Sequence, residues 1–406
     1  MRGATAAPAP PRERADRDRR GRVGAALPIL HYGFRPFFFL ASLHAGLAVP
    51  AWLWLFLAGP PTVGPFAGLQ WHVHEMLFGY LAAVIAGFIL TAVPNWTGRL
   101  PLSGRPLAVL VALWLAGRAA AGLISEPVLA MAVDLAFPAA LAFAVWREVV
   151  AGRNWRNAPV AGLITLFGIA NALHHGANLD LVDAATGPRL ALGAAALLMA
   201  LIGGRIVPSF TRNWLVKTGD GRLPAPAGRL DAAALAATAL AVLAWLVAPE
   251  AAASGVLLIA AGAALAARLA RWRGLAVFNE PMLLVLHAGY GWLALSLLLL
   301  GAANLTDAVA QSAAIHALTA GAVGTMTLAV MTRASLGHTG RAIVADRAIV
   351  AIFWLVTAGA AARVAAPLAG GWYLPVLVTG GALWSGAFLL FAIRCAPVLF
   401  GPRRTA

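Results

Sequence analysis

The sequence predicts an all-α protein, a polytopic membrane bundle of about twelve transmembrane helices. Of its 406 residues, 61% are hydrophobic and only 11% are charged, whereas a soluble domain carries about 25% charged residues. The apolar residues form long unbroken blocks, each close to the roughly 20 residues that cross a bilayer as a helix. Lys and Arg gather in every second connection between the blocks. We therefore expect a single membrane domain over residues 28–400.

The apolar blocks give the twelve helices in order. Their connections are short, except for a basic loop expected from Arg212 to Arg229. The expected helices are 36–58, 71–94, 106–124, 127–146, 158–176, 189–208, 230–248, 251–270, 281–301, 308–332, 348–366 and 372–395.

Basic residues predict the orientation of the bundle. Residues 1–27 are rich in Arg, Pro and Ala, so we expect a disordered, basic cytoplasmic tail there. With the N-terminus inside, 27 of the 30 Lys and Arg residues lie in inside segments, and only Arg118, Arg189 and Arg363 lie outside. Both termini are then expected in the cytoplasm. Membrane topology thus accounts for the net charge of +15, and the expected partners of the basic surface are membrane lipids, not nucleic acid.

Short internal sequence similarities predict three parallel repeats of four helices. The motif LHAG or LHHG occurs on the first, fifth and ninth expected helices. On the second helix, His74 precedes Gly79 by the same spacing that separates His316 from Gly321 on the tenth. Similarity at a fixed period of roughly 115–125 residues indicates a repeated supersecondary unit.

Histidines are the main candidate ligands. The single cysteine, Cys395, excludes an intrachain disulfide and a cysteine-ligated iron–sulfur cluster. A metal would therefore depend on the nine histidines, on methionine or on carboxylates. Five histidines lie toward the outer ends of their helices: His72, His74, His174, His175 and His316. Imidazoles at similar depth suit a haem or a copper site, and the alternative for each is a water-capped interfacial histidine.

Three ionisable residues open the second helix. His72 and His74 differ by about 200° in direction around a helix, so they are expected on opposite sides, with Glu75 on the side of His72. One histidine is then available to a haem and the other to a second centre. Because ionisable groups in a membrane are costly unless paired, ligating or hydrated, we expect Glu75 to orient a ligand or to pass protons.

Three other polar residues stand out within expected helices. Asp134 on the fourth helix is expected to pair structurally with Arg118 or with a backbone carbonyl, and the alternative is that it passes protons or orients a ligating histidine. His287 and Tyr290 lie one turn apart on the ninth helix. They are expected either to face a cavity as a polar pair or to hydrogen-bond to each other within the core.

Six segments resemble the NnrS family. They are HYGFRPFFFLASLHAG (31–46), WHVHEMLFGYLAAVIAGFILTAVPNWTGR (71–99), ALHHGANLD (172–180), GGRIVPSFTRNW (203–214), HAGYGWL (287–293) and IHALTAGAVGTMTLAVMTRASLGHTGR (315–341). They cover most of the chain from residue 28 onward, and the second and the last are long and specific. The resemblance implies a bacterial inner-membrane protein that contains haem and copper and is associated with denitrification and with relief of nitric oxide stress.

An analogy suggests which residues hold these cofactors. Catalytic subunits of haem–copper oxidases also have twelve helices in three arcs of four, with haem-ligating histidines on the second and tenth helices. By this analogy we expect His74 and His316 to be haem axial ligands. His72, His174 and His175 are the next candidates, for copper or a second centre. The sixth helix has no histidine, which argues against an oxidase-type binuclear centre.

The expected function is that of a haem- and copper-binding membrane protein whose partner is nitric oxide or a related small molecule. Scavenging, sensing and redox conversion are all open, so the sequence does not decide whether the protein is an enzyme, and the oligomeric state is open too. One alternative is a secondary transporter with a histidine-lined polar pathway, which requires helices interrupted at mid-membrane. Another is an assembly factor for other metalloproteins.

Overall fold

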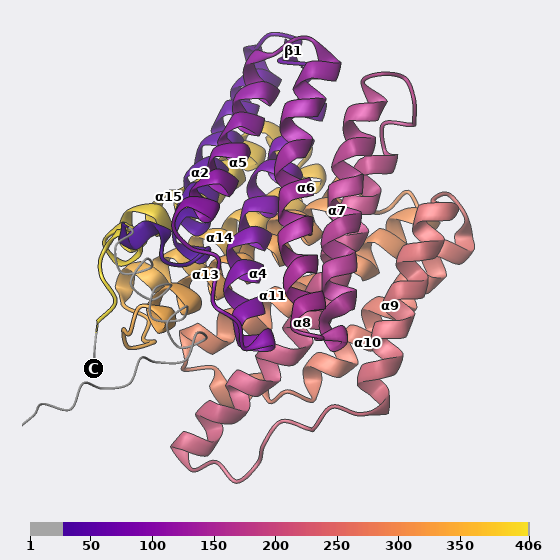
Figure 1. Ribbon diagram of the computed structural model, residues 1–406. Helices are drawn as coiled ribbons and strands as arrows, with labels where there is room; N and C mark the ends of the chain where they lie inside the picture. The colour runs from indigo at the N-terminus through magenta and orange to yellow at the C-terminus, as the bar shows by residue number, and fades with distance from the viewer. Residues whose placement is uncertain (1–26, 405–406) are drawn as a thin grey trace, which may run out of the picture.

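The structure is a computed structural model that describes residues 27–404, almost all of them in helices (Figure 1). Twelve of the described segments are long and apolar enough to cross a membrane, which confirms the predicted fold class. Nearly all of the basic tail expected over residues 1–27 lies outside the described residues.

The membrane-crossing segments fall into three groups of four in chain order. The first group comprises η1 (Pro28–Leu30), α2 (Phe34–Ala58), β1 (Thr62–Val63), β2 (Phe66–Ala67), α3 (Gly68–His74), η2 (Glu75–Leu81), α4 (Ala82–Thr97), α5 (Arg105–Leu123) and α6 (Pro127–Ala151). The second comprises η3 (Trp155–Asn157), α7 (Ala158–Ala177), α8 (Thr186–Thr218), α9 (Arg229–Val247) and α10 (Ala252–Ala270). The third comprises η4 (Gly274–Val277), α11 (Pro281–Leu305), α12 (Gln311–His316), η5 (Ala317–Val323), α13 (Gly324–His338), α14 (Arg347–Ala365), η6 (Ala366–Leu368), η7 (Gly370–Trp372) and α15 (Tyr373–Phe400).

Local chemistry sets many of the helix ends. The carboxylate of Glu126 accepts hydrogen bonds from the amides of Val128 and Leu129, at 3.0 and 2.6 Å, so that α6 starts with its free N–H groups satisfied. Gly98 ends α4 in the left-handed conformation, with φ 68°. Caps of this kind fix where a helix begins and therefore which of its side chains face the interior.

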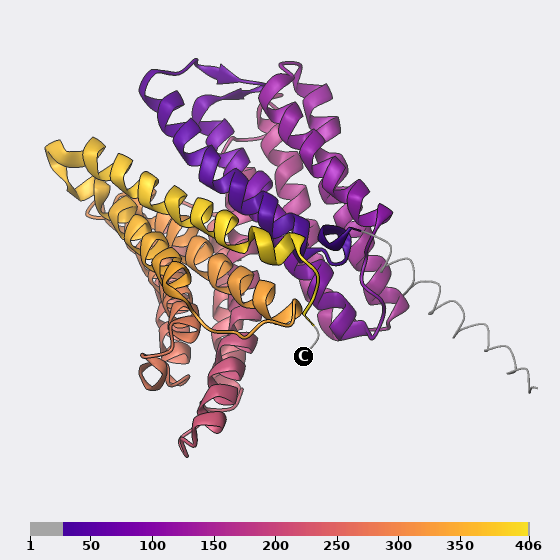
Figure 2. The same cartoon turned by 90° about the vertical axis from the view of Figure 1, so that its left-hand side faces the viewer.

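The expected boundary at Arg212 is wrong. Helix α8 continues to Thr218, where Gly219 ends it in the left-handed conformation with φ 80°. The basic stretch therefore begins as two further helical turns, which project beyond the bundle in Figure 2. Apolar Leu215 is buried and holds this extension against the protein, which explains why charge alone misplaced the boundary.

The three groups form a closed ring. The last helix of each group packs against the first helix of the next: α6 against α7, α10 against α11, and α15 against α2 (Figure 2). In each group the second crossing segment is the most buried of the four. These three segments, α3–η2–α4, α8 and α12–η5–α13, therefore form the inside of the ring, as a three-repeat fold requires.

Two of the inner segments contain matching π-helical turns. The first, η2, follows His74 directly and has seven residues; the second, η5, follows His316 directly and has the same length. The sequence match of these two histidines therefore corresponds to the same backbone feature in the first and third groups. A π-helical turn is rare and often marks a functional site.

The inner segments meet at mid-bundle. The hydroxyl oxygens of Tyr80 and Thr327 lie 2.5 Å apart, which ties η2 to α13. The indole N–H of Trp384 donates to the carbonyl of Ala320 at 3.2 Å and so satisfies one carbonyl of the second π-helical turn. These polar contacts fix the first and third groups relative to each other within an otherwise apolar core.

Both ends of the described chain lie at one end of the bundle. The guanidinium of Arg35, near the start of α2, donates to the carbonyl oxygens of Leu399 and Gly401 at 2.8 and 2.6 Å. The opposite end carries the short hairpin of β1 and β2, at the top of Figure 1, and is called the hairpin end below.

Candidate metal centre

A cluster of polar side chains lies buried at the hairpin end. It is built from α2, from the junction of α3 and η2, and from α5, α6 and α7, so five crossing segments contribute to it. His74, the last residue of α3, is fully buried at its centre. Its neighbours are two carboxylates, one guanidinium and two further imidazoles.

His74 is held from both sides by carboxylates. Its Nδ1 lies 2.9 Å from Oε1 of Glu75, and its Nε2 lies 3.1 Å from Oδ2 of Asp134. Because an ionised carboxylate only accepts hydrogen bonds, both contacts together require a doubly protonated, positively charged ring when both carboxylates are ionised. The expected grouping of Glu75 with His72 is therefore wrong: the π-helical turn begins at Glu75 and directs this carboxylate toward His74 instead.

Asp134 is the hub of the cluster. Its Oδ2 also lies 3.2 Å from Nε2 of His175 and accepts a hydrogen bond from Nδ2 of Asn171 at 2.6 Å. Its Oδ1 accepts from the guanidinium of Arg118. The expected pair with Arg118 is thus present, but the expectation that Asp134 has only this structural role is incomplete, because His74 and His175 share the same carboxylate.

Arg118 bridges the two carboxylates of the cluster. Its second terminal nitrogen donates to Oε1 of Glu75 at 2.6 Å, and the other oxygen of Glu75 lies 3.0 Å from Nε2 of His44. One guanidinium and two carboxylates leave one net negative charge among the buried groups if all imidazoles are neutral. Unpaired charge in a low-dielectric interior is costly, so the set needs one more positive charge.

Three imidazoles surround the ring of Phe66. This residue belongs to the hairpin, is fully buried, and lies 4.5, 5.2 and 5.1 Å by ring centroids from His74, His174 and His175. A tight turn at Gly64, with φ 55°, brings the second strand back over the helix ends. The hairpin therefore acts as an apolar cover that separates the cluster from the outside.

The donor atoms of the cluster converge on one point. His74, Asp134 and His175 each offer one ligand atom, and these atoms all lie within 4.8 Å of one another. His174 stacks on His74 at 5.6 Å between ring centroids, and its Nε2 donates to the carbonyl of Gln70 at 3.1 Å. Its Nδ1 is left as a buried acceptor with no hydrogen-bond partner among the described residues.

Two glycines make room for this network. A Cβ added at Gly79 would come within 3 Å of Nε2 of His44 and of the Arg118 guanidinium. One added at Gly117 would collide with the carboxylate of Asp134. The carbonyl oxygen of Gly79, inside the π-helical turn, accepts from the indole N–H of Trp114 at 3.0 Å. Both glycines therefore allow the helices to approach closely enough for the side chains to meet.

His72 and His316 lie apart from this cluster. His72 points to the opposite side of α3 from His74, as expected, and its ring stacks on Trp52 at 4.9 Å. His316 bonds through Nδ1 to the carbonyl of Ser312 at 2.7 Å and interacts electrostatically with His72 and Arg363. Among the described residues, the contacts between His74 and its neighbours do not include His316, so the structure does not bring the expected His74–His316 pair together within this cluster.

His287 and Tyr290 are not part of either histidine group. Nε2 of His287 lies 2.9 Å from the hydroxyl of Thr211, whereas the hydroxyl of Tyr290 accepts from Arg268 at 3.0 Å. Each side chain has its own partner on a different helix, so the expected His287–Tyr290 pair is not the arrangement that the structure shows.

Sequence reasoning missed three participants in the cluster: His44, Arg118 as a bridge, and Asn171. From the sequence, no site role is expected for His44 or Asn171, and Arg118 is expected to pair with Asp134 alone. The available signal was the cost of ionisable groups in membrane helices, which applies to Arg118 and Asp134 as much as to Glu75. Pairing across helices could not be read from spacing along one helix.

The fold and this cluster define a multi-pass membrane protein with a buried group of histidines and carboxylates suited to a cation. A comparison with protein families matches residues 28–403 to the NnrS protein family. The chain belongs to the NnrS family, so it is a membrane protein related to the nitric oxide response, in a family generally linked to haem and copper. A search of curated proteins gives no match.

Proposed function

We propose that the protein binds copper and haem in the bacterial inner membrane and acts on nitric oxide, or on a related small molecule, in denitrification and resistance to nitrosative stress. The observation that carries this proposal is the convergence of His74, Asp134 and His175, with ligand atoms within 4.8 Å of one another in a buried site. Family membership supplies the chemical context.

The charge of the cluster supports a bound cation. Without metal, the positive charge of the doubly protonated His74 ring balances the negative charge left by Glu75, Asp134 and Arg118. A metal ion at the meeting point of the ligand atoms would supply that positive charge in place of the proton. It would also take the place of the contacts that His74 and His175 now make with the same carboxylate oxygen of Asp134.

The donor set favours copper. Imidazole suits copper, iron and zinc, and copper binds most strongly of the common divalent metals to a given nitrogen and oxygen site. The buried, unpartnered Nδ1 of His174 is an available fourth donor beside His74. Asn171, Arg118 and Glu75 hydrogen-bond to the ligating groups and would orient them.

The haem site is assigned to His72 and His316. The pairing suggested by sequence, His74 with His316, is replaced because both ring nitrogens of His74 already face carboxylates within a closed cluster. His316 has its Nδ1 bonded to a backbone carbonyl, which leaves Nε2 free to ligate iron. His72 has a buried Nδ1 without a partner.

A nearby cation fits the carboxylates that a haem carries. Arg363 on α14 interacts electrostatically with both His72 and His316, and its Nη1 is buried without a partner in the part of the chain that the structure describes. A guanidinium binds a carboxylate strongly and in a defined geometry. When bound, haem iron would supply nitric oxide binding, and the residues of this chain would hold the haem between the first and third groups.

The transporter alternative lacks the feature that it requires. The described inner segments run without an unwound break, because the two π-helical turns continue directly into α-helix on both sides. The same proposal includes an orientation in the membrane. The distribution of Lys and Arg favours the hairpin end outside and both termini in the cytoplasm.

The test is the metal and haem content of the protein purified in detergent. Wild type is expected to hold copper and haem, and His175→Ala is expected to lose copper by at least about tenfold in affinity. His338→Ala is the matched control, because His338 packs on Phe34 at the end away from the hairpin. Wild-type protein without copper, or equal copper in both variants, would contradict the proposal.

A further inference from the structure

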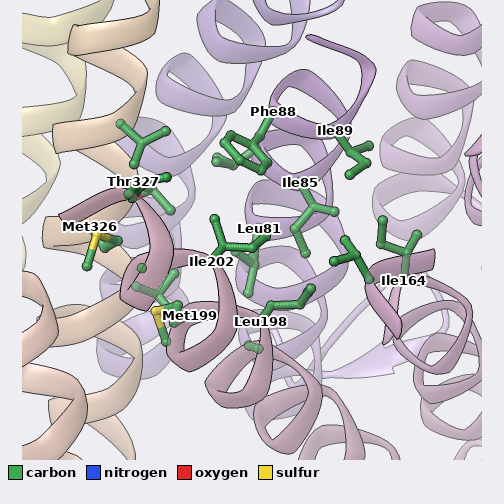
Figure 3. A pocket seen from close by; sticks show the side chains of 17 residues that line it. Leu81, Ile85, Phe88, Ile89, Ile164, Leu198, Met199, Ile202, Met326 and Thr327 are labelled. Atoms are coloured by element: carbon green, nitrogen blue, oxygen red, sulfur yellow. The ribbon is translucent and has the colours of Figure 1, made fainter. Parts of the chain in front are cut away.

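A hollow lies where the three inner segments meet (Figure 3). Its volume is about 100 Å³, and it is lined by 17 side chains from η2, α4, α7, α8, η5 and α13. Leu81 and Phe88 form one wall, Leu198 and Ile202 another, and Met326 closes a third (Figure 3). The space is therefore bordered by one segment from each of the three groups and by α7, and it is partly open at the surface.

The lining offers almost nothing to water. Thr327 is its only residue with a side-chain hydroxyl, and that group is already bonded to Tyr80 at 2.5 Å and to the carbonyl of Gly324 at 3.1 Å. A water molecule needs two to four polar partners, and apolar cavities of roughly 150 Å³ stay dry and bind xenon or benzene. By that comparison, a volume of about 100 Å³ suits a small apolar molecule.

The hollow connects to the metal cluster through aromatic side chains. Phe78 precedes Leu81 by about one turn, and Phe167 follows Ile164 by about one turn on α7. The rings of Phe78 and Phe167 lie 5.4 Å apart, and that of Phe78 lies 5.6 Å from His74. The buried side chains of Phe78 and Phe167 thus form an apolar contact between the cluster and two residues near the hollow.

We propose that this hollow holds an apolar diatomic gas taken from the bilayer and delivers it past Phe78 and Phe167 to the His74 cluster. The assignment of the gas as nitric oxide rests on the proposed function. A small apolar gas concentrates in hydrocarbon, so a cavity among membrane helices can fill directly from lipid. The π-helical turn serves both sites, with Glu75 at the cluster and Leu81 at the hollow.

Xenon is the probe for the hollow itself. Protein in lipid nanodiscs is examined by ¹²⁹Xe NMR, and xenon-pressurised crystals are examined for anomalous scattering. One xenon site is expected among Leu198, Phe88 and Met326 in wild type. Ala195→Phe, which enlarges a buried lining residue, should abolish it. Leu201→Phe, on a shallow groove elsewhere on α8, should leave it intact.

The rate of nitric oxide binding tests delivery. Ala195→Phe is expected to slow nitric oxide binding to the reduced metal centre several-fold, with metal content unchanged, while Leu201→Phe keeps the wild-type rate. Ile206→Phe, on the same wall, replaces Ala195→Phe if that variant fails to fold.

Three outcomes overturn the inference: no xenon site in wild type, a xenon site only after lipid removal, or an unchanged binding rate in a variant that excludes xenon. The second outcome would make an acyl chain the occupant. Protein without metal would contradict the proposed function, and the xenon experiment would still decide whether the hollow takes an apolar gas.

Discussion

Nε2 of His74 lies 3.1 Å from Oδ2 of Asp134, although 60 residues separate them in the chain. The contact joins the last residue of α3, on an inner segment, to α6, and both residues are buried. These two residues supply two of the three ligand atoms of the candidate metal centre. The predictions below begin from this pair.

Asp134→Asn tests the hub of the cluster. The substitution keeps the shape but removes a ligand oxygen and the charge that balances Arg118, so copper should fall sharply. The free energy of unfolding should fall by about 3 kcal/mol, near the low end for a broken buried ion pair, because Glu75 still contacts Arg118. Metal analysis and thermal unfolding measure the two effects.

The control for that variant is Glu148→Gln. Glu148 bonds to Arg99 at 2.5 Å and to Arg147 at 2.9 Å in a more exposed position, so its loss should cost no more than about 1 kcal/mol. Copper should be unchanged. Equal effects of the two substitutions would show that Asp134 contributes only ordinary charge pairing.

Gly79→Ala tests the clearance within the π-helical turn. The added methyl group must displace His44 or Arg118, and overpacking of this kind costs roughly 1–3 kcal/mol. Gly162→Ala on α7 is the matched control, because a Cβ there meets nothing within 4 Å. It should be neutral or stabilising by up to about 1 kcal/mol, since alanine favours helix. Thermal unfolding separates them.

The two candidate haem pairings make different predictions. If His72 and His316 hold the iron, His72→Ala and His316→Ala should each remove or shift the reduced haem absorption bands, whereas His74→Ala should retain them. His287→Ala is the control, because His287 bonds to Thr211 far from the hairpin end. Retained bands in both His72→Ala and His316→Ala, with loss in His74→Ala, would restore the pairing suggested by sequence.

Asp346 lies outside the membrane-spanning segments, and its contacts predict that the stability of the protein falls at acid pH. Partial burial opposes its ionisation, but the amide of Ile349 at 2.9 Å and the guanidinium of Arg394 outweigh burial and hold the pKa of this carboxyl below its usual range. A carboxyl whose pKa is lower in the folded state stabilises fully above its unfolded pKa, near 3.9, and loses that contribution as the pH falls further.

The matching experiment is Asp346→Ala at two pH values. Near neutral pH the loss of this helix cap should cost about 1 kcal/mol. The difference from wild type should shrink as the pH falls below about 4, because the protonated carboxyl no longer contributes. Asp307→Ala, in an exposed connection, should follow the wild-type profile. A cost that is independent of pH would contradict the assigned role.

The fold was largely predictable, because each helix carries its own signal for crossing the membrane: the hydropathy of the helix and the basic residues in its flanking connections. All twelve candidate membrane-spanning helices coincide with the apolar blocks of the sequence. The matching sequence around His74 and His316 corresponds to matching π-helical turns. The site was less predictable. Asp134 meets His74 only because Gly117 lets α5 and α6 approach closely, and such a contact between helices leaves no periodic signal in the sequence.

The paired π-helical turns have a consequence for protein engineering. Glu75 begins the first, whereas Ala317, which carries no charge, begins the second. If the two inner segments arose by duplication of one ancestral segment, both would keep the same π-helical turn, but only the first would carry the ion-binding side chains. Introducing acidic and imidazole groups around Ala317 would then ask whether backbone shape suffices to create a second ion-binding pocket, or whether the surrounding helices must be rebuilt as well.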